Sequence, residues 1–308
     1  MSFAFELARF IPFRDQEVCA RVRAIRRADL CNHPNPQFHV RVIEDTDSFF
    51  LAFALDIVQR IQVAAEECRR FVAILPAGPM AQYDKAAAII NQLRIPMRHV
   101  HTFNMDEFAD QDGNTAPADW RGAFQYAMWN RFFSKIDADL RPPAEQIHFP
   151  SSANITHYGQ EIADLGGADV CYGGIGWCGH VAFWEAHLGD EFSNLDEFCQ
   201  AGPRLVELHP MTIMQTALHH GGDWSVVPPR AVTIGPAEIL GARLRSFWLN
   251  VNLGGVSWQR FIGRLVAFGP VNQWVPGSIL QLAPTDYTLV GAVADDLEPV
   301  YSDPAAGA

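Results

Sequence analysis

The amino-acid sequence predicts an α/β protein with a doubly wound, mostly parallel, Rossmann-like sheet and helices on both of its faces. The main observation is an alternation of short apolar runs with longer segments of helical spacing, from residue 38 to residue 294. In addition, the run at 70–76 is apolar at nearly every position, as in a strand covered on both faces. Because no repeat or linker interrupts this pattern, we expect one α/β domain over 38–294.

Local patterns predict the elements of the chain in order. Residues 1–37 are expected to form an N-terminal extension with one short helix at about 16–27. The domain begins with a strand at 38–43, after which Asp45 or Thr46 can cap the next helix. Further strands are expected at 70–76, 97–103, 146–149, 168–176, 204–208, 230–235, 245–253 and 287–293, and helices at about 48–67, 80–93, 120–133, 157–165 and 257–268. The tail, 295–308, starts with acidic residues and is expected to fray.

Composition and charge limit the classes of function. The chain has 308 residues, 49% of them hydrophobic, and a mean hydropathy of -0.01, which is typical of a folded globular protein. No apolar run approaches the ~20 residues that span a bilayer, and a signal-peptide pattern is missing, so we expect no membrane partner. Six cysteines without a Cys-x-x-Cys pair favour a reducing cytoplasm. With a formal net charge of -12 and only two lysines, we expect no binding to nucleic acid.

Three polar stretches follow predicted strands directly: L-P-A-G-P-M (75–80), F-N-M-D-E-F (103–108) and G-G-I-G-W-C-G-H (173–180). Each alone could be a capped turn. Ligands of doubly wound folds bind at the carboxyl ends of the strands, however, so three such stretches together predict an active site there.

The third stretch continues as V-A-F-W-E and carries several chemically active side chains. Its glycines allow a close approach of the backbone to a ligand, but the spacing is that of neither a Walker A loop nor a dinucleotide fingerprint. The cluster of Cys178, His180, Glu185 and His187 could hold a metal, yet it lacks a helical pair of histidines four residues apart. We expect no metal, and we interpret His180 as an imidazole that Glu185 orients for proton transfer.

The second stretch carries two adjacent carboxylates, Asp106 and Glu107. Either one could cap the following segment. A carboxylate just past a buried strand is also well placed to act as a general base.

Together, F-N-M-D-E-F and G-G-I-G-x-x-G-H-V-A-F-x-E resemble the glucosamine-6-phosphate deaminase/isomerase family. The resemblance extends more weakly through V-P-P-R-A-V-T-I-G-P-A-E-I-L (227–240) and S-I-L-Q-L (278–282). It implies aldose–ketose isomerisation of an amino sugar with loss of ammonia and without a cofactor. It also implies that Asp106 is the base acting between C1 and C2, that His180 opens the sugar ring, and that Glu185 is the partner of His180.

The resemblance extends to the sugar pocket and to assembly. Residues expected to contact the substrate are Ala77, Gly78, Glu107, Gly174, Gly176, Cys178 and Trp184. A homo-oligomer is expected by analogy with the family.

Several residues depart from the family pattern. Cys178 stands where the family has aspartate, and Trp184 stands where it has asparagine. The loop after the second strand, L-P-A-G-P-M, is two residues shorter than in the family and lacks both threonines. The late lysine and the central arginine of the family are absent, which leaves Arg204, Arg260 or Arg264 as replacements.

These departures keep several hypotheses about function open. We expect weak binding of phosphorylated sugars, with Trp184 or Trp258 filling the phosphate subsite. A free amino sugar then becomes a candidate substrate. A catalytically weakened sugar-binding protein is a rival hypothesis, and so is a sugar lactonase, because the lactonase family shares the fold and a similar glycine-histidine motif.

Overall fold

The fold is that of a computed structural model, which describes residues 5–254 and 257–297. Its centre is a seven-stranded sheet in the order β1-β10-β9-β6-β2-β3-β5, in which every neighbouring pair is parallel. This confirms the predicted doubly wound α/β fold. The strands are β1 (Phe38–Ile43), β2 (Phe71–Leu75), β3 (Val100–Asn104), β5 (Ile147–His148), β6 (Val170–Gly173), β9 (Leu244–Leu249) and β10 (Thr285–Val290).

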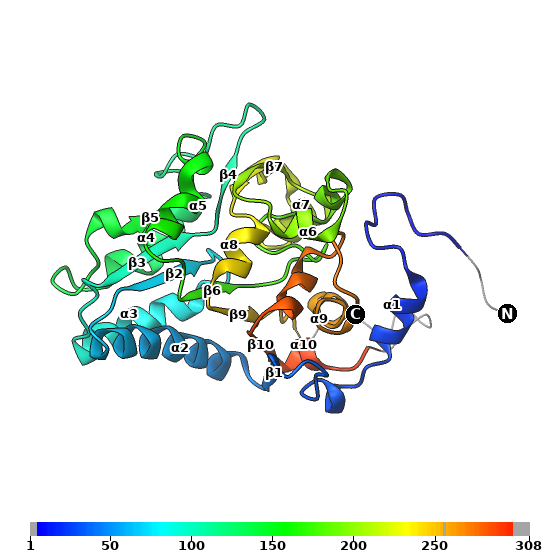
Figure 1. Ribbon diagram of the computed structural model, residues 1–308, viewed down its shortest axis with the longest axis horizontal. Coiled ribbons are helices and arrows are strands. Elements are labelled where there is room, and N and C mark those ends of the chain that lie inside the picture. Colours follow the sequence, from blue (N-terminus) through cyan, green and yellow to red (C-terminus); the bar gives the residue numbers. More distant parts are fainter. Residues whose placement is uncertain (1–4, 255–256, 298–308) are drawn as a thin grey trace.

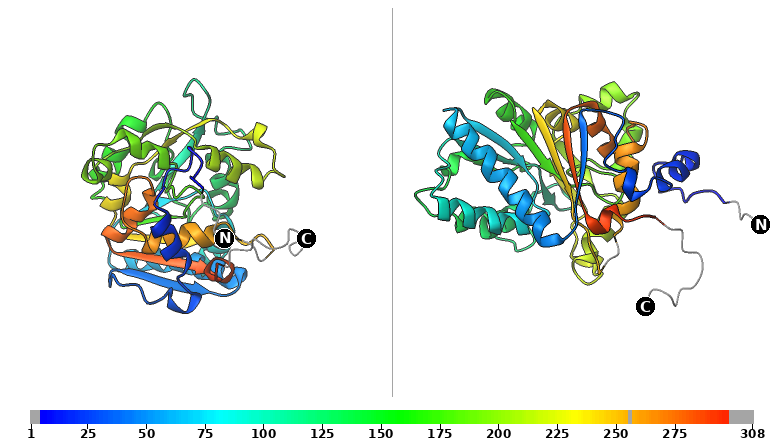
Figure 2. Two further views of the ribbon diagram at one scale, coloured as in Figure 1. Left: turned by 90° about the vertical axis from the view of Figure 1, so that its right-hand side faces the viewer. Right: turned by 90° about the horizontal axis from the view of Figure 1, so that it is seen from below.

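Helices cover both faces of this sheet (Figures 1 and 2). Helices α2 (Thr46–Glu66) and α3 (Ala81–Leu93) pack against each other on one face, and α5 (Ile155–Asp164) and α9 (Gln259–Phe268) lie on the other. Burial between the two layers explains why β2 is apolar at all five of its positions. Of the two candidate caps of α2, Asp45 is used: its carboxylate accepts a hydrogen bond from the Ser48 amide at 2.8 Å.

A second, three-stranded sheet stands beside the main one, in the order β4-β8-β7. It consists of β4 (Asp106–Ala109), β7 (Arg204–Glu207) and β8 (Arg230–Thr233), and both of its pairings are antiparallel. The sequence predicts two of these runs as strands, at 204–208 and 230–235, but it does not predict β4, and it does not separate the three from the main sheet. Only Met105 lies between β3 and β4, so the chain passes from one sheet to the other next to the catalytic candidates.

The remaining helices are short: α1 (Gln16–Arg23), α4 (Phe124–Arg131), α6 (Leu195–Cys199), α7 (Pro210–Leu218), α8 (Pro236–Gly241) and α10 (Gly291–Ala294). Two of them begin or end inside the range predicted from the sequence. Helix α1 ends at Arg23 rather than at 27, and α4 begins at Phe124 rather than at 120, because a turn occupies the residues from Pro117 to Trp120. Most of the predicted fraying tail lies outside the described residues.

Helix α2 is, within 5–254 and 257–297, the one helix whose length and composition would allow it to cross a membrane. The sequence shows no continuous apolar run of this length, because Asp56 and Arg60 lie within the helix. These two side chains form a salt bridge of 2.9 Å. One side of α2 packs into the core through Phe49, Phe53 and five other buried residues. A core helix has the same composition, so the absence of a membrane partner stays a prediction.

Candidate active site

The candidate site lies at the carboxyl ends of β6, β2 and β3, which are neighbours in the sheet. The order of strand addition reverses here: after β2, strands β3 and β5 are added toward one edge of the sheet, whereas β6, β9 and β10 are added on the other side of β2. Such a switch point is where doubly wound folds open a crevice for a ligand. The three polar stretches singled out in the sequence therefore lie together at the carboxyl ends of these three strands.

Three side chains hold one nitrogen of His180. Its Nδ1 lies 3.3 Å from the Cys178 Sγ, 2.9 Å from the Thr212 Oγ1 and 3.3 Å from the Glu185 Oε2. The Glu185 Oε2 in turn accepts hydrogen bonds from the Cys178 thiol at 3.0 Å and from the Thr212 hydroxyl at 2.9 Å. All four residues are buried. No hydrogen bond from the described residues engages Nε2, so that nitrogen is left for a ligand.

The charges of this cluster favour an imidazolium–carboxylate pair. Burial alone would lower the pKa of His180, but the charge of Glu185 raises this pKa well above its ordinary value. Conversely, burial opposes ionisation of Glu185, and the His180 charge nevertheless holds the pKa of Glu185 below its usual value. Burial and then the Glu185 charge raise the pKa of the Cys178 thiol. The thiol therefore stays protonated and donates to Glu185, which supplies the negative charge.

The glycines of the motif create the space for this imidazole. A Cβ at Gly176 would lie 2.0 Å from the His180 ring, so only glycine fits beneath it. The Gly176 amide also donates to the His180 carbonyl at 3.0 Å, which closes the turn. At Gly174 an added Cβ would meet nothing nearer than the Trp248 carbonyl at 3.6 Å, an ordinary contact.

Asp106 provides a second acid–base group close to the imidazole. It is 6% exposed, and burial followed by the charge of Glu107 raises its pKa to about 8, against the lowering effect of His180. No hydrogen bond to its carboxylate comes from the part of the chain that the structure describes. A carboxylate that is desolvated and unpaired has the properties of a general base poised near neutral pH.

Glu107 points the other way and has a structural task. Its carboxylate accepts hydrogen bonds from the amides of Phe124 at 2.9 Å and Gln125 at 2.8 Å, at the start of α4. It also accepts one from the Phe108 amide at 2.9 Å. Adjacent strand residues alternate in direction, so Asp106 can face the site while Glu107 caps a helix. The capping interpretation therefore applies to Glu107, so its contact with substrate is not supported, while the role of Asp106 as a general base stays a prediction.

The chain is similar to known proteins over most of its length. No family model matches the chain. A glucosamine-6-phosphate isomerase of Candida albicans is 34% identical over 221 residues, which cover 69% of this chain and 81% of that protein. The chain belongs to the glucosamine-6-phosphate deaminase/isomerase family.

Solved structures show the same fold. A monomeric glucosamine-6-phosphate deaminase matches with a TM-score of 0.69 and 20% identity, over 83% of this chain and 98% of that one. A 6-phosphogluconolactonase of Thermotoga maritima matches with a TM-score of 0.58 and 16% identity, over 82% and 99% of the two chains. At these identities the likeness concerns the fold alone.

The remaining candidates for substrate contact differ in whether a ligand can reach them. Ala77 and Gly78 lie in the loop after β2, and a Cβ at Gly78 would meet no described atom within 4 Å, so space is open beside this loop. Trp184 is fully buried and lies among Phe192 and Phe198 instead, with ring centroids 6.1 Å away from each. Trp258 stacks on Trp177 at 5.8 Å.

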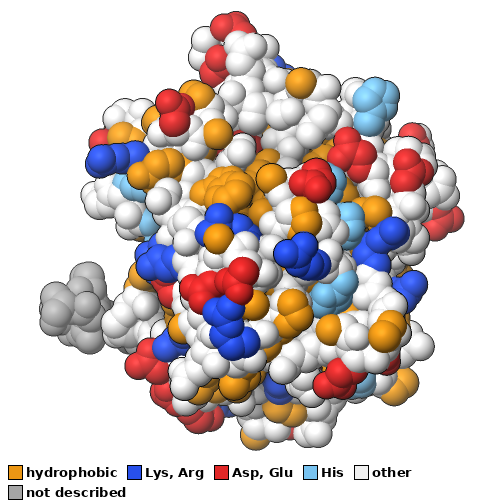
Figure 3. Space-filling model, turned by 90° about the vertical axis from the view of Figure 1, so that its left-hand side faces the viewer, with side chains coloured by type: hydrophobic (Ala, Val, Ile, Leu, Met, Phe, Trp, Pro, Cys, Tyr) orange, Lys and Arg blue, Asp and Glu red, His pale blue; other side chains and the backbone are white. Residues whose placement is uncertain are grey.

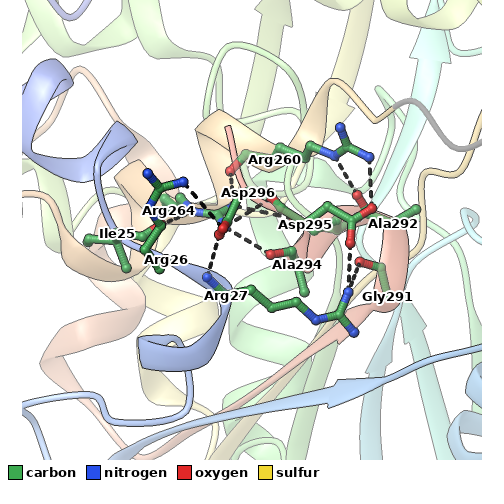
Figure 4. A network of polar contacts seen from close by, with 11 residues as sticks. Ile25, Arg26, Arg27, Arg260, Arg264, Gly291, Ala292, Ala294, Asp295 and Asp296 are labelled. Carbon is green, nitrogen blue, oxygen red and sulfur yellow. Dashed lines mark hydrogen bonds and ion pairs between the residues drawn. The ribbon is translucent and has the colours of Figure 1, made fainter. Parts of the chain in front are cut away.

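The three arginines considered as phosphate ligands are engaged elsewhere. Arg264, 2% exposed, donates to the carbonyls of Ile25 at 3.0 Å and Ala294 at 2.9 Å (Figure 4). Arg260 donates to the Ala292 carbonyl at 2.7 Å and pairs with Asp295 at 2.9 Å (Figure 4). Arg204 pairs with Glu191 at 2.7 Å and lies over the Trp184 ring at 4.9 Å. Binding a phosphate through any of them would require these contacts to break.

The same cluster could be considered as a metal centre. The ligand atoms of Cys178, His180 and Glu185 lie within 4.8 Å of one another. The hydrogen bonds among them account for this closeness without an ion, because the thiol and the Thr212 hydroxyl saturate the Glu185 Oε2. The expectation that the site holds no metal stays a prediction.

Two residues of the site were not found from the sequence. Thr212 lies in the first turn of α7 and reaches the His180 cluster from a segment 32 residues further along the chain. Phe183 packs beside the imidazole, with ring centroids 6.0 Å apart, and bonds through its amide to the Thr233 hydroxyl at 3.0 Å. No local pattern marks Thr212. Among the aromatic residues that follow His180 in the motif, the departure from the family pattern drew attention to Trp184 rather than to Phe183.

Proposed function

We propose that this family member catalyses the isomerisation and deamination of an amino sugar, with Asp106 and His180 as its proton-transfer groups. The observation that carries the proposal is the pairing of an unbonded, buried carboxylate with an imidazole tethered through one nitrogen only. The two groups are close enough for the charge of His180 to lower the pKa of Asp106. Proton transfer at two neighbouring positions of one substrate needs such a pair.

The reaction then divides between the two residues. The His180 imidazolium donates its Nε2 proton to the ring oxygen as the ring C–O bond breaks, and Nε2 then takes the proton of the C1 hydroxyl, so the open aldose forms and the imidazolium is restored. Glu185, Thr212 and Cys178 hold the opposite nitrogen and keep the ring oriented during this transfer.

Asp106 acts next on the open chain. It removes the proton from C2, the electron pair forms the C1–C2 double bond, and the His180 imidazolium protonates the former C1 carbonyl oxygen, which gives the enolamine. Asp106 returns its proton to C1, which leaves a C2 iminium. Water adds to this iminium and gives up a proton to the now neutral His180, and the loss of ammonia gives the ketose. The raised pKa of Asp106 suits both halves of this step, because the group must accept a proton and give it back.

The proposal is tested first with Asp106→Asn, which removes the base but keeps the shape of the side chain. We expect kcat/KM to fall by about 3 kcal/mol or more of transition-state stabilisation while the circular dichroism spectrum is unchanged. His180→Gln should slow turnover of the closed sugar more than that of the open-chain form. Near-normal turnover by Asp106→Asn, or equal losses on both sugar forms by His180→Gln, would contradict the assigned roles.

The substrate is proposed to be an amino sugar that is free or phosphorylated, and a sugar phosphate is expected to bind weakly. This follows from the shortened loop at Ala77 and Gly78 and from the engaged arginines. A screen should measure ammonia and ketose together for glucosamine 6-phosphate and for free amino sugars. Micromolar binding of a sugar phosphate by calorimetry would refute the weak-binding part of the proposal.

A second candidate activity is hydrolysis of a sugar lactone, which the fold likeness to the lactonase favours. The same screen includes a 6-phosphogluconolactone sample, with acid release as the readout. Lactone hydrolysis that persists in Asp106→Asn, without any ammonia release by the wild type, would favour this candidate. A cytoplasmic location, a homo-oligomer and the absence of nucleic-acid binding stay predictions.

A further inference from the structure

A polar pocket opens at the amino-terminal ends of the strands, on the opposite side of the sheet from the carboxyl ends that carry the candidate active site. It lies where α2 ends and β2 and β3 begin, and it has a volume of about 470 Å³. Figure 3 shows this side of the molecule, on which arginine or lysine and histidine side chains lie next to one another. The polar residues that line the pocket are Arg69, Arg70, Arg98, His99, His101 and Gln146.

The pocket concentrates positive charge in a chain whose formal net charge is -12. Arg69 is compensated, because it pairs with Glu67 at 2.6 Å and Asp169 at 3.0 Å. Arg70 makes only a 3.3 Å hydrogen bond to the Leu165 carbonyl. For Arg98 the described residues offer no hydrogen bond or ion pair, and no carboxylate is among those that line the pocket. Within the described chain, two guanidinium groups are therefore left without a counter-charge.

Buried polar atoms of the pocket also lack partners. Gln146 Nε2 lies 2.7 Å from His101 Nε2 and donates to it, so the proton of neutral His101 is on Nδ1. The buried Nδ1 of His101 has no acceptor within the described part of the chain. The buried Oε1 of Gln146 likewise has no donor there. Burial and the charge of Arg70 lower the pKa of His101, which keeps this imidazole neutral. Buried polar atoms are normally satisfied, so this wall of the pocket is polar and not fully compensated by the described protein atoms.

We propose that this pocket binds a small phosphorylated anion through Arg70 and Arg98. Planar guanidinium groups bind phosphate oxygens in a bidentate manner, and two of them converge on this pocket. The volume matches that of small-molecule sites, which span roughly 300–1,000 Å³. An extended polyanion is disfavoured, because the rest of this acidic surface would repel it.

The pocket is independent of the proposed reaction but connected to it through the fold. Strands β2 and β3 begin at the pocket and end at the loop of Ala77 and Gly78 and at Asp106, respectively. A ligand bound at Arg70 and Arg98 would thus contact the starts of the two strands whose carboxyl ends lead into the candidate active site. The binding test below uses no turnover, so its outcome does not depend on the proposed activity.

The test is calorimetric titration of the full chain with pyrophosphate and with inorganic phosphate. We expect pyrophosphate to bind more tightly, and Arg70→Ser and Arg98→Ser each to weaken it about tenfold, the loss expected from one charge-assisted contact. The matched control is Arg23→Ser, which removes the same charge from an exposed position on α1, at the other end of the molecule in Figure 1. Unchanged affinity in the control supports a local site.

Three outcomes would overturn the proposal. The first is no heat with either anion at millimolar concentration, and the second is equal weakening in all three variants. The third is undiminished binding in both Arg70→Ser and Arg98→Ser, which would place the anion elsewhere. If a variant misfolds, wild-type protein labelled with 15N-arginine provides the same decision. Pyrophosphate should then shift two arginine Nε resonances strongly, and a spectrum that does not change rules the site out.

Discussion

His180 obtains its partners from two parts of the chain. Cys178 and Glu185 are within seven residues of each other, whereas Thr212 comes from the first turn of α7. Since the thiol stays protonated, Cys178 and Thr212 both act as neutral donors to Glu185, and the negative charge of the cluster is carried by one carboxylate. The replacement of the aspartate by Cys178 thus keeps a single buried charge pair, which costs less desolvation than two carboxylates would.

The pKa of Asp106 makes a prediction about stability against pH. Its pKa rises from 3.8 to about 8 on folding, so between these values the folded protein holds a proton that the unfolded chain has released. The free energy of unfolding therefore falls as the pH rises through this window. Relative to Asp106→Asn, the wild type should lose about 1.4 kcal/mol per pH unit there, measured by urea unfolding at several pH values. Parallel curves for the two proteins would show that Asp106 is ionised in the fold.

At the scale of elements, the glycine-rich turn after β6 supports the imidazole. The ring of His180 lies directly over Gly176, where a side chain would collide with it, while Gly174 faces only ordinary contacts. The turn therefore works as a platform for one side chain. The neighbouring strand β4 contributes Asp106 to the site and Glu107 to the start of α4, so it links catalysis to helix placement.

Gly176→Ala tests this platform. The added methyl group displaces the His180 ring, and a displacement of about 1 Å at a catalytic group can lower kcat about 100-fold. The control is Gly174→Ala, two residues away in the same turn, where the nearest atom is 3.6 Å from the new Cβ. We expect steady-state kinetics to show the loss for Gly176→Ala alone. Comparable kcat values in the two variants would mean that the turn does not position His180.

At the scale of the whole molecule, the N-terminal extension is tied to the C-terminal part of the domain. Arg27 pairs with Asp295 at 2.6 Å, and its amide donates to Asp296 at 2.6 Å (Figure 4). Arg27 also pairs with Glu44. Arg264 joins the same network from α9. The separation of the chain into an extension, a domain and a tail stays a prediction. These contacts show that residues 25–27 pack against α9 and the residues after α10.

Arg264→Met should destabilise the protein strongly. The guanidinium is 2% exposed and donates to several backbone carbonyls, which methionine would leave without donors. We expect a loss of at least about 3 kcal/mol in urea unfolding. Arg243→Met is the control, since its side chain is 68% exposed and has one salt bridge, to Asp169. A stable Arg264→Met variant with weakened sugar-phosphate binding would instead assign Arg264 to the substrate.

Local patterns were sufficient for the alternation of strands and helices and for the strand ends that bear Asp106 and His180. Continuous apolar runs such as β2 and the Asp45 cap depend on neighbours in sequence, so the sequence by itself determined the α/β alternation and the strand ends that bear Asp106 and His180. Element ends such as that of α1 were less accurate, because they depend on a cap or turn rather than on periodicity.

Only the tertiary structure decided which side chains complete the site. Thr212 reaches His180 across 32 residues, Trp184 is buried away among Phe192 and Phe198, and β4, β7 and β8 form a sheet of their own. The physical reason is that a strand or helix pattern specifies which face of an element is apolar but not which distant element covers it. Pairing and packing between remote segments make that choice, because they bury the remaining polar groups against partners.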